Sequence, residues 1–427
     1  MNRRLVASAV LLVLLCATFA SAQVAAPVVG RDARVAVVGD SITEQKLYSR
    51  YIELYLLACQ PQLQTTSMQF GWGGEWAAGF ANRMDNDLMP FKPTVVTLCY
   101  GMNDGQYRAY EESIGKRYGD PLRDIVKRLK AAGVTVVVGG PGVVDAKTFR
   151  NDPAQALTYN DNLRQLSEIA RGIATEAGMP FADVHGAMMD AMTKAKAALG
   201  VDFQVAGGDG VHPGADGHLV MAYAFLKAMG FDGNLGTITV DLKGKAEATG
   251  GHRVLSDQAG VVELESTRYP FCFFGAPNDS NGTRSILPFV PFNQDLNRLT
   301  LIVKNLGAEQ GQVTWGKVSK TFARADLEKG INLAAEFLDN PFSETWNRLD
   351  GAVGNKESFE TFMIKNQING FPWLTAQFKD DPTGLAALDG MRTALWNREV
   401  KNQNDLRALI VPIKHTLTVA PAPTAGG

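Results

Sequence analysis

The sequence predicts an α/β fold in which a largely parallel sheet carries helices on both faces. Between residues 33 and 235, short β-branched runs alternate with longer segments whose apolar residues recur at helical spacing. The strand-like runs are apolar almost throughout, which is typical of strands that are buried on both faces. Polar, glycine-containing motifs follow several of these runs directly, at the edge where such sheets bind their ligands.

Five strands and five helices are expected in this region. The strand-like runs cover residues 35–38, 66–70, 94–99, 134–138 and 180–184. Helical spacing covers residues 44–59, 121–132, 157–177, 186–199 and 217–229. One helix is expected to start at Pro121 and to end before Gly133, because proline suits the first helical position and glycine suits the position past the end.

The pattern changes in the second half of the chain, near residue 236. Residues 236–325 contain several runs of alternating polarity, which predict a β-rich accessory region. Residues 326–416 have predominantly helical character, and the Pro/Ala/Gly-rich residues 417–427 are expected to form a disordered tail. The length of 427 residues is long for one core and agrees with more than one domain.

The first 22 residues have the features of a cleaved signal peptide. Arg3 and Arg4 precede an apolar run over residues 5–20, and Ala20-Ser21-Ala22 supplies the small residues that a signal peptidase recognises. The run is too short and too weakly flanked to be a stable membrane span. We therefore expect export to the periplasm, the cell surface or the medium.

Charge and cysteine content bear on partners and on stability. The chain has 42 basic and 44 acidic residues, so its charge gives no reason to expect nucleic acid or anionic membranes as partners. One of the four cysteines lies in the predicted signal peptide, and the other three allow at most one disulfide. The fold must therefore be stabilised mainly by ordinary hydrophobic cores.

Ser41 is the first candidate for chemistry. Gly39-Asp40-Ser41-Ile42 directly follows the first predicted strand and opens a helix. The backbone N–H of a residue at a helix N-terminus lacks a helical partner and can donate to an anion. The alternative is that Ser41 only caps this helix, which is a common role for serine.

His212 is the candidate base that a nucleophilic serine requires. It lies three residues after Asp209 in a glycine-containing turn, just before the last predicted helix of the α/β region. The aspartate could hold one ring nitrogen while the other nitrogen faces the serine. The alternative is a solvated loop histidine beside an ordinary turn aspartate.

Two further motifs could stabilise a developing oxyanion. Asn103 follows the strand at 94–99, and its side-chain amide could donate a hydrogen bond, although residues 103–105 would also suit a simple turn. Gly71-Trp72-Gly73-Gly74 follows the second strand, and glycine lets a backbone N–H approach a ligand closely.

The order of these motifs resembles the SGNH hydrolase superfamily, also called GDSL-like lipases or acylhydrolases. The resemblance covers about residues 33–232 and rests on GDSI at 39–42, GMND at 101–104 and DGVHP at 209–213. It implies a three-layer α/β/α domain of flavodoxin-like strand order, with no metal and no cofactor.

The resemblance also implies a role for each motif residue. Ser41 would be the nucleophile, His212 the general base and then acid, and Asp209 the residue that orients His212. The oxyanion hole would combine the Ser41 N–H, the Asn103 side chain and a backbone N–H from the glycine-rich motif. For that last donor Gly71 is chosen over residues 73 and 74.

The resulting hypothesis is an exported serine esterase that acts on a small-molecule or polysaccharide ester, with acetylated carbohydrate as the favoured substrate. Trp72, Trp76 and Tyr107 follow the motifs and could line the rim of the pocket, although aromatic residues pack in cores more often than they bind ligands.

Three alternatives stand beside this hypothesis. An acyltransferase would use the same acyl-serine and differ only in its acceptor. A non-catalytic surface or carbohydrate-binding protein would not need the motif residues, which are all present here. A metal-dependent phosphoesterase would need a cluster of ligands that no spacing in the sequence suggests.

Overall fold

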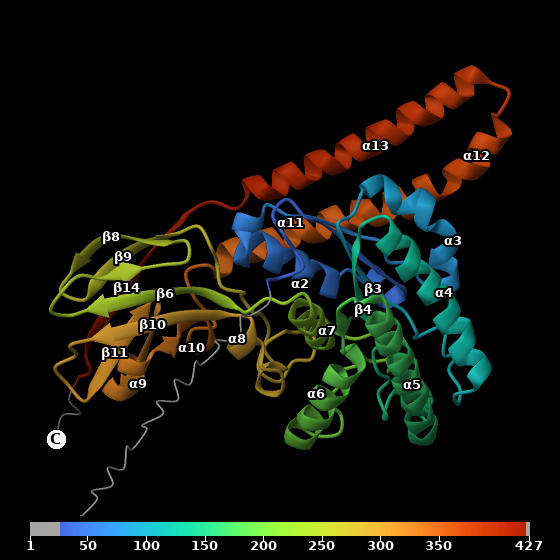
Figure 1. The fold of residues 1–427 in the computed structure, drawn as a ribbon. Coiled ribbons are helices and arrows are strands. Elements are labelled where there is room, and N and C mark those ends of the chain that lie inside the picture. Colours follow the sequence, from blue (N-terminus) through green and yellow to red (C-terminus); the bar gives the residue numbers. More distant parts are fainter. Residues whose placement is uncertain (1–25, 424–427) are drawn as a thin grey trace, which may run out of the picture.

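The computed structural model describes residues 26–423 (Figure 1). The predicted signal peptide lies outside the described residues. Within residues 26–423, no helix is both long enough and apolar enough to cross a membrane.

A parallel five-stranded sheet forms the centre of the first half of the chain. Its spatial order is β2-β1-β3-β4-β5, and every neighbouring pair is parallel, which confirms the flavodoxin-like order. All residues of β3 and nearly all of β1 and β4 are buried, as their continuous apolar sequence predicts. The strands are β1 (Arg34–Gly39), β2 (Thr66–Gln69), β3 (Val95–Cys99), β4 (Thr135–Gly139) and β5 (Phe181–Ala182).

Helices cover both faces of this sheet and complete the three-layer α/β/α domain. One face carries α3 (Ala77–Asp87), α4 (Glu112–Ala131) and α5 (Pro153–Ala177). The other face carries α2 (Tyr48–Leu54), α6 (Val184–Leu199) and α7 (Ala215–Ala228), while the short α1 (Ser41–Glu44) follows β1 at the sheet edge. Alternate residues of the central strands contribute to two separate cores, one under each layer of helices.

The predicted start of a helix at Pro121 is wrong. Helix α4 begins at Glu112 and contains Pro121 in its interior. Ile114, Tyr118 and Leu122 are buried one helical turn apart, so the apolar stripe extends well before the proline. The packing of this stripe outweighs the loss of one helical hydrogen bond at Pro121.

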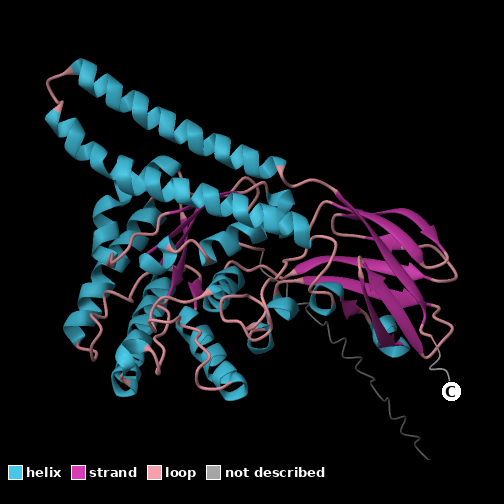
Figure 2. Ribbon diagram, turned by 180° about the vertical axis from the view of Figure 1, so that it is seen from behind, coloured by secondary structure: helices cyan, strands magenta, loops and turns pink. Residues whose placement is uncertain are grey.

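The accessory β-region consists of two sheets, which lie at one end of the molecule, away from the central sheet (Figure 2). One sheet has the order β13-β10-β6-β7 and the other the order β12-β11-β14-β9-β8. Trp315 is fully buried in this region, so it belongs to the core and not to an exposed binding face. The strands are β6 (Asn234–Asp241), β7 (Glu247–Ala248), β8 (His252–Gln258), β9 (Val261–Ser266), β10 (Arg298–Lys304), β11 (Gln310–Trp315), β12 (Val318–Ala323), β13 (Ile331–Asn332) and β14 (Ile413–Pro421).

The expectation of a disordered tail at 417–427 is wrong for residues 417–421. They belong to β14, which pairs with β9 along its first part and with β11 along its second part. Leu417 and Val419 are both buried, so this segment supplies a central strand of the five-stranded accessory sheet. The local composition does not indicate a strand here, because this strand is specified by pairing with segments far away in the sequence. The last four residues of the predicted tail, 424–427, lie outside the described residues.

A long helical segment, residues 343–408, which we call the helical arm, lies between β13 and β14 in the chain and packs on the α/β domain. It contains α11 (Ser343–Thr361), α12 (Phe371–Gln377) and α13 (Pro382–Ala408), and α13 runs back beside α11 (Figure 1). The shorter helices α8 (Phe292–Asp295), α9 (Arg324–Lys329) and α10 (Leu333–Glu336) precede the arm. The predicted helical stretch 326–416 is therefore interrupted by β13 and ends before β14.

The arm covers the outer edge of the central sheet. Lys356 Nζ donates to the Ser67 carbonyl at 2.7 Å, and the Glu360 carboxylate accepts from the Gln69 N–H at 2.9 Å. These side chains satisfy backbone groups of β2, which is an edge strand of this sheet. The arm is therefore joined to the α/β domain through its edge strand.

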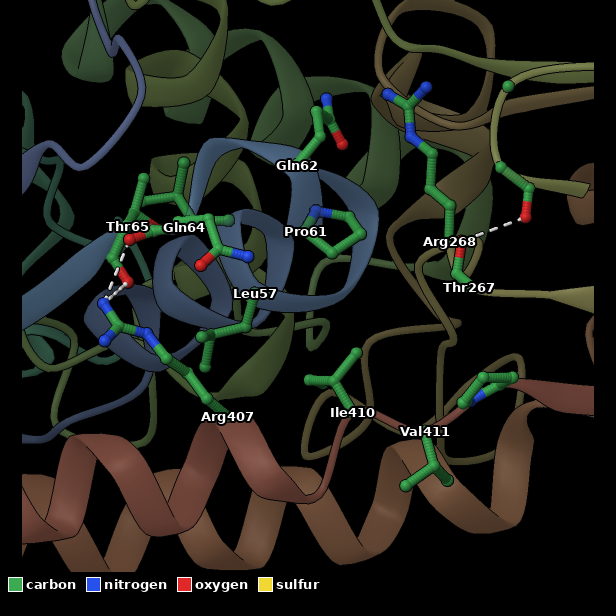
Figure 3. A pocket seen from close by; sticks show the side chains of 14 residues that line it. Leu57, Pro61, Gln62, Gln64, Thr65, Thr267, Arg268, Arg407, Ile410 and Val411 are labelled. Atoms are coloured by element: carbon green, nitrogen blue, oxygen red, sulfur yellow. Dashed lines mark hydrogen bonds between the residues drawn. The ribbon is translucent and has the colours of Figure 1, made fainter.

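A cavity of about 690 Å³ lies where the α/β domain, the β-region and the end of α13 meet (Figure 3). At one side of it, Arg407 of α13 donates to the carbonyls of Gln64 and Thr65, and elsewhere in its lining Arg268 donates to the Gln60 side chain. Thr65 immediately precedes β2, so this cavity lies at the amino end of the sheet. The polar motifs lie at the opposite, carboxyl end.

Candidate active site

Ser41 is the first residue of α1, directly past the end of β1. The cap of this helix is Asp40, whose Oδ1 accepts from the Ile42 N–H at 3.0 Å. The Ser41 hydroxyl is therefore not used as the cap, which answers the alternative raised by its position. Gly39 is required here because a Cβ would lie 2.6 Å from the Cys99 carbonyl oxygen on the neighbouring strand.

His212 lies between Ser41 and Asp209 in space. Its Nε2 is 2.9 Å from Ser41 Oγ, and its Nδ1 is 2.7 Å from Asp209 Oδ2. The other oxygen of Asp209 accepts from the N–H groups of Val211 and His212, both at 2.9 Å. Partial burial opposes ionisation of Asp209, but these hydrogen bonds outweigh it, and the pKa of this carboxyl lies below its usual value. An ionised Asp209 can thus hold the ring with Nε2 toward the serine.

Gln45 and His218 brace the loop that carries His212. Gln45 Nε2 donates to the Pro213 carbonyl at 3.2 Å, and His218 Nε2 lies 3.2 Å from Gln45 Oε1. The Tyr48 N–H donates to His218 Nδ1 at 3.2 Å. Burial lowers the pKa of His218 to about 3, so this imidazole stays neutral and can make both contacts. Sequence reasoning missed Gln45, which belongs to none of the motifs.

Asp216, in the first turn of α7, adds a pH dependence to the stability of this region. Its Oδ1 accepts from the Gly217 N–H at 2.7 Å, whereas Oδ2 is buried with no partner among the described residues. Burial, with a smaller contribution from the charge of Asp279, raises the pKa of Asp216 to about 8.

Replacement of Asp216 by asparagine should therefore stabilise the fold increasingly as the pH rises. A folded-state pKa above the unfolded one gives stability that is complete below about pH 4 and is lost as the pH rises to about 8. Asparagine has nearly the same shape as aspartate but does not ionise. The free energy of unfolding of the variant, relative to wild type, should therefore grow by up to about 1.4 kcal/mol per pH unit in this window. Urea unfolding at pH 5 and pH 8 measures the difference, and an equal difference at both values would contradict the prediction.

Asn103 lies in the turn after β3, close to the loop that follows β2. Its Nδ2 donates to the Glu75 carbonyl at 3.1 Å, and its Oδ1 accepts from the Tyr107 hydroxyl at 2.9 Å. An amide nitrogen carries two hydrogens, so one remains for an incoming oxyanion. Tyr107, predicted as a rim residue, thus orients Asn103, and its half-buried ring stacks on Phe149 and Tyr159.

The structure does not leave Gly71, the predicted backbone donor of the oxyanion hole, with a free N–H. The Gly71 N–H already donates to Gln69 Oε1 at 2.9 Å, and the Gly73 N–H donates to the Glu44 carboxylate. Gly74 is exposed, has a φ of +73° that favours glycine, and its N–H has no acceptor among residues 26–423. Gly74 also precedes the residue whose carbonyl contacts Asn103. Of the three glycine N–H groups in this motif, the free one is therefore that of Gly74.

Charged residues hold the loop after β2 from two sides. Buried Arg83 of α3 donates to the Glu75 carboxylate at 2.7 Å and to the Phe70 carbonyl at 2.8 Å. On the other side, Lys365 Nζ lies 2.7 Å from Glu44 Oε1, and Glu44 is the residue that accepts from the loop. Lys365 belongs to the helical arm, and no sequence motif marks it.

The two predicted rim tryptophans are half-buried, and each lies beside a positive charge. The centroid of the Trp72 ring lies 4.9 Å from the Arg83 guanidinium carbon and 5.2 Å from Lys365 Nζ. The centroid of the Trp76 ring lies 5.7 Å from the Arg117 guanidinium carbon. Trp72 thus contacts cations of both the α/β domain and the helical arm.

The described residues hold no group of three or more His, Cys, Asp or Glu side chains arranged to bind a metal ion. Within the same residues, Cys59, Cys99 and Cys272 are buried free thiols. The polar groups that the site does present are a serine hydroxyl, an imidazole, a carboxylate and a side-chain amide.

The first half of the chain is similar in sequence to known hydrolases. Residues 37–220 match the GDSL-like Lipase/Acylhydrolase family. A relative is the acetylxylan esterase of Geobacillus stearothermophilus, which is 25% identical over 227 residues that cover 48% of this chain and 97% of the relative.

The fold is similar to solved structures. A gut microbial diltiazem-metabolizing enzyme has a TM-score of 0.72 at 21% identity, and the match covers 92% of this chain and 98% of that one. This likeness of fold extends over both halves of the chain. An alpha/beta hydrolase from the metagenome of Lake Arreo, Spain, has a TM-score of 0.40 at 22% identity over 48% of this chain and 98% of its own.

The family match includes all the motifs from the serine to the histidine, and the sheet order and helix layers agree with it. Residues 37–220 therefore form a GDSL-like lipase/acylhydrolase domain of the SGNH hydrolase superfamily, and the protein is a carboxylic ester hydrolase.

Proposed function

We propose that this protein is an exported serine esterase that removes acetyl groups from carbohydrates through an acyl-enzyme on Ser41. The observation that carries the proposal is the continuous chain from Ser41 Oγ to His212 Nε2 and from His212 Nδ1 to Asp209, at 2.9 and 2.7 Å. This arrangement supplies a nucleophile, a base and a group that orients the base.

In the first half of the proposed reaction, His212 Nε2 takes the proton of Ser41 as Oγ attacks the ester carbonyl carbon. The carbonyl oxygen becomes an oxyanion, and the tetrahedral intermediate then collapses. The C–O bond to the alcohol breaks, His212 gives its proton to the leaving oxygen, and the acyl group stays on Ser41. A water molecule then repeats the sequence, so that the acid leaves and Ser41 regains its proton.

Three donors would meet the oxyanion in this proposal. The Ser41 N–H at the start of α1 has no acceptor among the described residues, and neither has the Gly74 N–H. The third donor is the second hydrogen of Asn103 Nδ2, which Tyr107 and Glu75 hold in place. Donors that are fixed before the reaction stabilise the oxyanion without reorganisation.

The acetyl group and the carbohydrate are proposed from two supports. One is the similarity to a protein described as an acetylxylan esterase. The other is the predicted signal peptide at residues 1–22, which would carry the enzyme toward extracellular polysaccharide. Export would be checked by the mass of the mature protein from the native host, which should correspond to cleavage after Ala22.

Acetate release tests the substrate proposal. Acetylated xylo-oligosaccharide should lose acetate and gain one free hydroxyl for each acetate released. p-Nitrophenyl acetate should be a better substrate than the corresponding octanoate. Hydrolysis of octanoate esters with no release of acetate from acetylated sugar would contradict the proposal, and transfer of acetyl to an added sugar would reveal an acyltransferase.

The contact between Lys365 and Glu44 predicts a positioning effect of the helical arm on turnover. Lys365→Met leaves the Glu44 carboxylate without its counter-charge, beside the loop that presents Gly74. Both side chains are partly screened by solvent, so we expect a loss of only about 10-fold in kcat for p-nitrophenyl acetate, with KM nearly unchanged. Steady-state kinetics measure both constants.

Lys365→Arg should restore most of the lost turnover, because it keeps the charge. Lys379→Met, which changes an exposed lysine of the same arm, is the matched control and should have wild-type activity. A change in KM as large as that in kcat, or equal losses in the Met and Arg variants, would contradict the positioning role.

A further inference from the structure

A second cavity, of about 530 Å³, opens beside His212 and is built by both halves of the chain. Gln204 and His212 come from the loop between α6 and α7, within the α/β domain. Phe274 and Asn281 come from the long connection between β9 and α8, within the accessory region. The accessory region therefore supplies one wall of the cavity beside His212, the proposed base.

The connection that supplies this wall is anchored by hydrogen bonds. Thr283 Oγ1 accepts from the Phe274 N–H at 3.0 Å, and the Arg284 N–H donates to the Phe274 carbonyl at 3.1 Å. Arg284 also donates to the Phe273 carbonyl at 3.0 Å and forms an ion pair with Asp339. The backbone of Phe274 is thus held in place beside the His212 loop.

The geometry of the proposed reaction indicates which part of the substrate this cavity would hold. His212 must give its proton to the oxygen of the leaving alcohol, so that oxygen has to lie within hydrogen-bond reach of Nε2. In the proposed oxyanion hole, the acyl oxygen would point instead toward Gly74 and Asn103. The alcohol part of the ester would therefore extend from His212 into the cavity that His212 lines.

The lining of the cavity indicates a neutral alcohol with several hydroxyl groups. It contains no Lys, Arg, Asp or Glu side chain among the described residues. The side-chain amides of Gln204 and Asn281 make no hydrogen bond within residues 26–423, and an amide can both donate to and accept from a hydroxyl. The ring of Phe274 is 40% exposed and offers an apolar face.

We propose that this cavity is the alcohol subsite of the esterase, and that Gln204, Phe274 and Asn281 bind a neutral sugar ring of the substrate there. The inference rests on the proposed function and assigns a role to the accessory region, which supplies residues that select the alcohol. The volume of the cavity falls within the range of about 300–1,000 Å³ that is usual for small-molecule sites.

Two esters of the same acid test the subsite. Acetylated xylo-oligosaccharide carries a sugar as its alcohol, whereas the alcohol of ethyl acetate has only two carbons and no sugar ring. Phe274→Ala and the double variant Gln204→Ala/Asn281→Ala should each lower kcat/KM for the sugar ester by about 10-fold or more, equivalent to about 1.4 kcal/mol. Activity on ethyl acetate should stay within about twofold of wild type, which also shows that the variants are folded.

Phe378→Ala is the matched control, because Phe378 is 38% exposed but lies in the helical arm, outside the lining of this cavity. It should leave both activities unchanged. Equal losses on both esters, or no loss on either, would overturn the subsite. A wild-type enzyme that hydrolyses ethyl acetate but no acetylated sugar would overturn the carbohydrate proposal itself. Assays of the wild-type enzyme alone reveal this outcome, so it can be distinguished from failure of the subsite proposal.

Discussion

Ser41→Ala is expected to lower kcat for p-nitrophenyl acetate by about 10⁴-fold or more, with little change in KM. The reason is that the variant lacks the hydroxyl that lies 2.9 Å from His212 Nε2 and that would attack the ester. The residual rate would come from the oxyanion donors and from substrate binding. Steady-state kinetics of wild type and variant measure the ratio.

Ser167→Ala provides a matched control for this experiment. Ser167 lies in α5, is buried, and its hydroxyl has no partner among the described residues. Its removal should leave turnover near the wild-type value. Activity in Ser41→Ala within about tenfold of wild type would be incompatible with an acyl-serine at this position.

Lys356→Met should have the largest effect on stability, a loss of about 3–5 kcal/mol in the free energy of unfolding near pH 8. Lys356 is only 3% exposed and lies among buried carboxyl groups of α2, α11 and α13. Its Nζ lies 3.0 Å from Glu53 and 3.7 Å from Glu399, and it also contacts Glu360. Without the lysine, those of these carboxyl groups that are ionised at pH 8 would be buried with no counter-charge.

The pH dependence of this loss follows from the carboxyl groups. Burial, opposed by Lys356, raises the pKa of Glu53 to about 7, and burial raises the pKa of Glu399 to about 9. Groups with raised folded-state pKa values stabilise the fold at low pH and lose that contribution as the pH rises through those values. The loss in the free energy of unfolding caused by Lys356→Met should therefore be smaller at pH 5, because these carboxyl groups can be protonated in the folded state at that pH.

Urea unfolding at pH 5 and pH 8 checks the loss and its pH dependence. Lys401→Met is the control, because Lys401 makes an exposed ion pair with Asp405 in α13. Its replacement should lower the free energy of unfolding by less than about 1 kcal/mol. A loss for Lys356→Met no larger than that of the control would show that the buried cluster does not hold the arm to the α/β domain.

Much of the α/β domain could be predicted from local sequence, because its elements are specified by short-range patterns. The strands β1, β3 and β4 are nearly continuous apolar runs, and their parallel arrangement follows from the helices between them. The motifs around Ser41, Asn103 and His212 pointed to the residues of the site because each directly follows a strand or precedes a helix.

The parts that could not be predicted depend on contacts that no local pattern encodes. Gly71 and Gly74 belong to one glycine-rich motif, and the hydrogen bond to the Gln69 side chain decides that the Gly71 N–H is occupied. Lys365 lies 321 positions from Glu44, and nothing near either residue indicates that the two meet. Strand β14 is likewise defined by its pairing with β9 and β11, not by its own composition.

Covalent labelling with an alkyl fluorophosphonate, followed by mass spectrometry, shows directly whether Ser41 is the nucleophile. Ser41 Oγ should attack phosphorus and displace fluoride, which gives one adduct per chain on the peptide that contains Ser41. Loss of esterase activity should follow labelling in proportion, and Ser41→Ala should remain unlabelled. An adduct on another residue, or full activity in fully labelled protein, would contradict the assignment of Ser41 as the nucleophile.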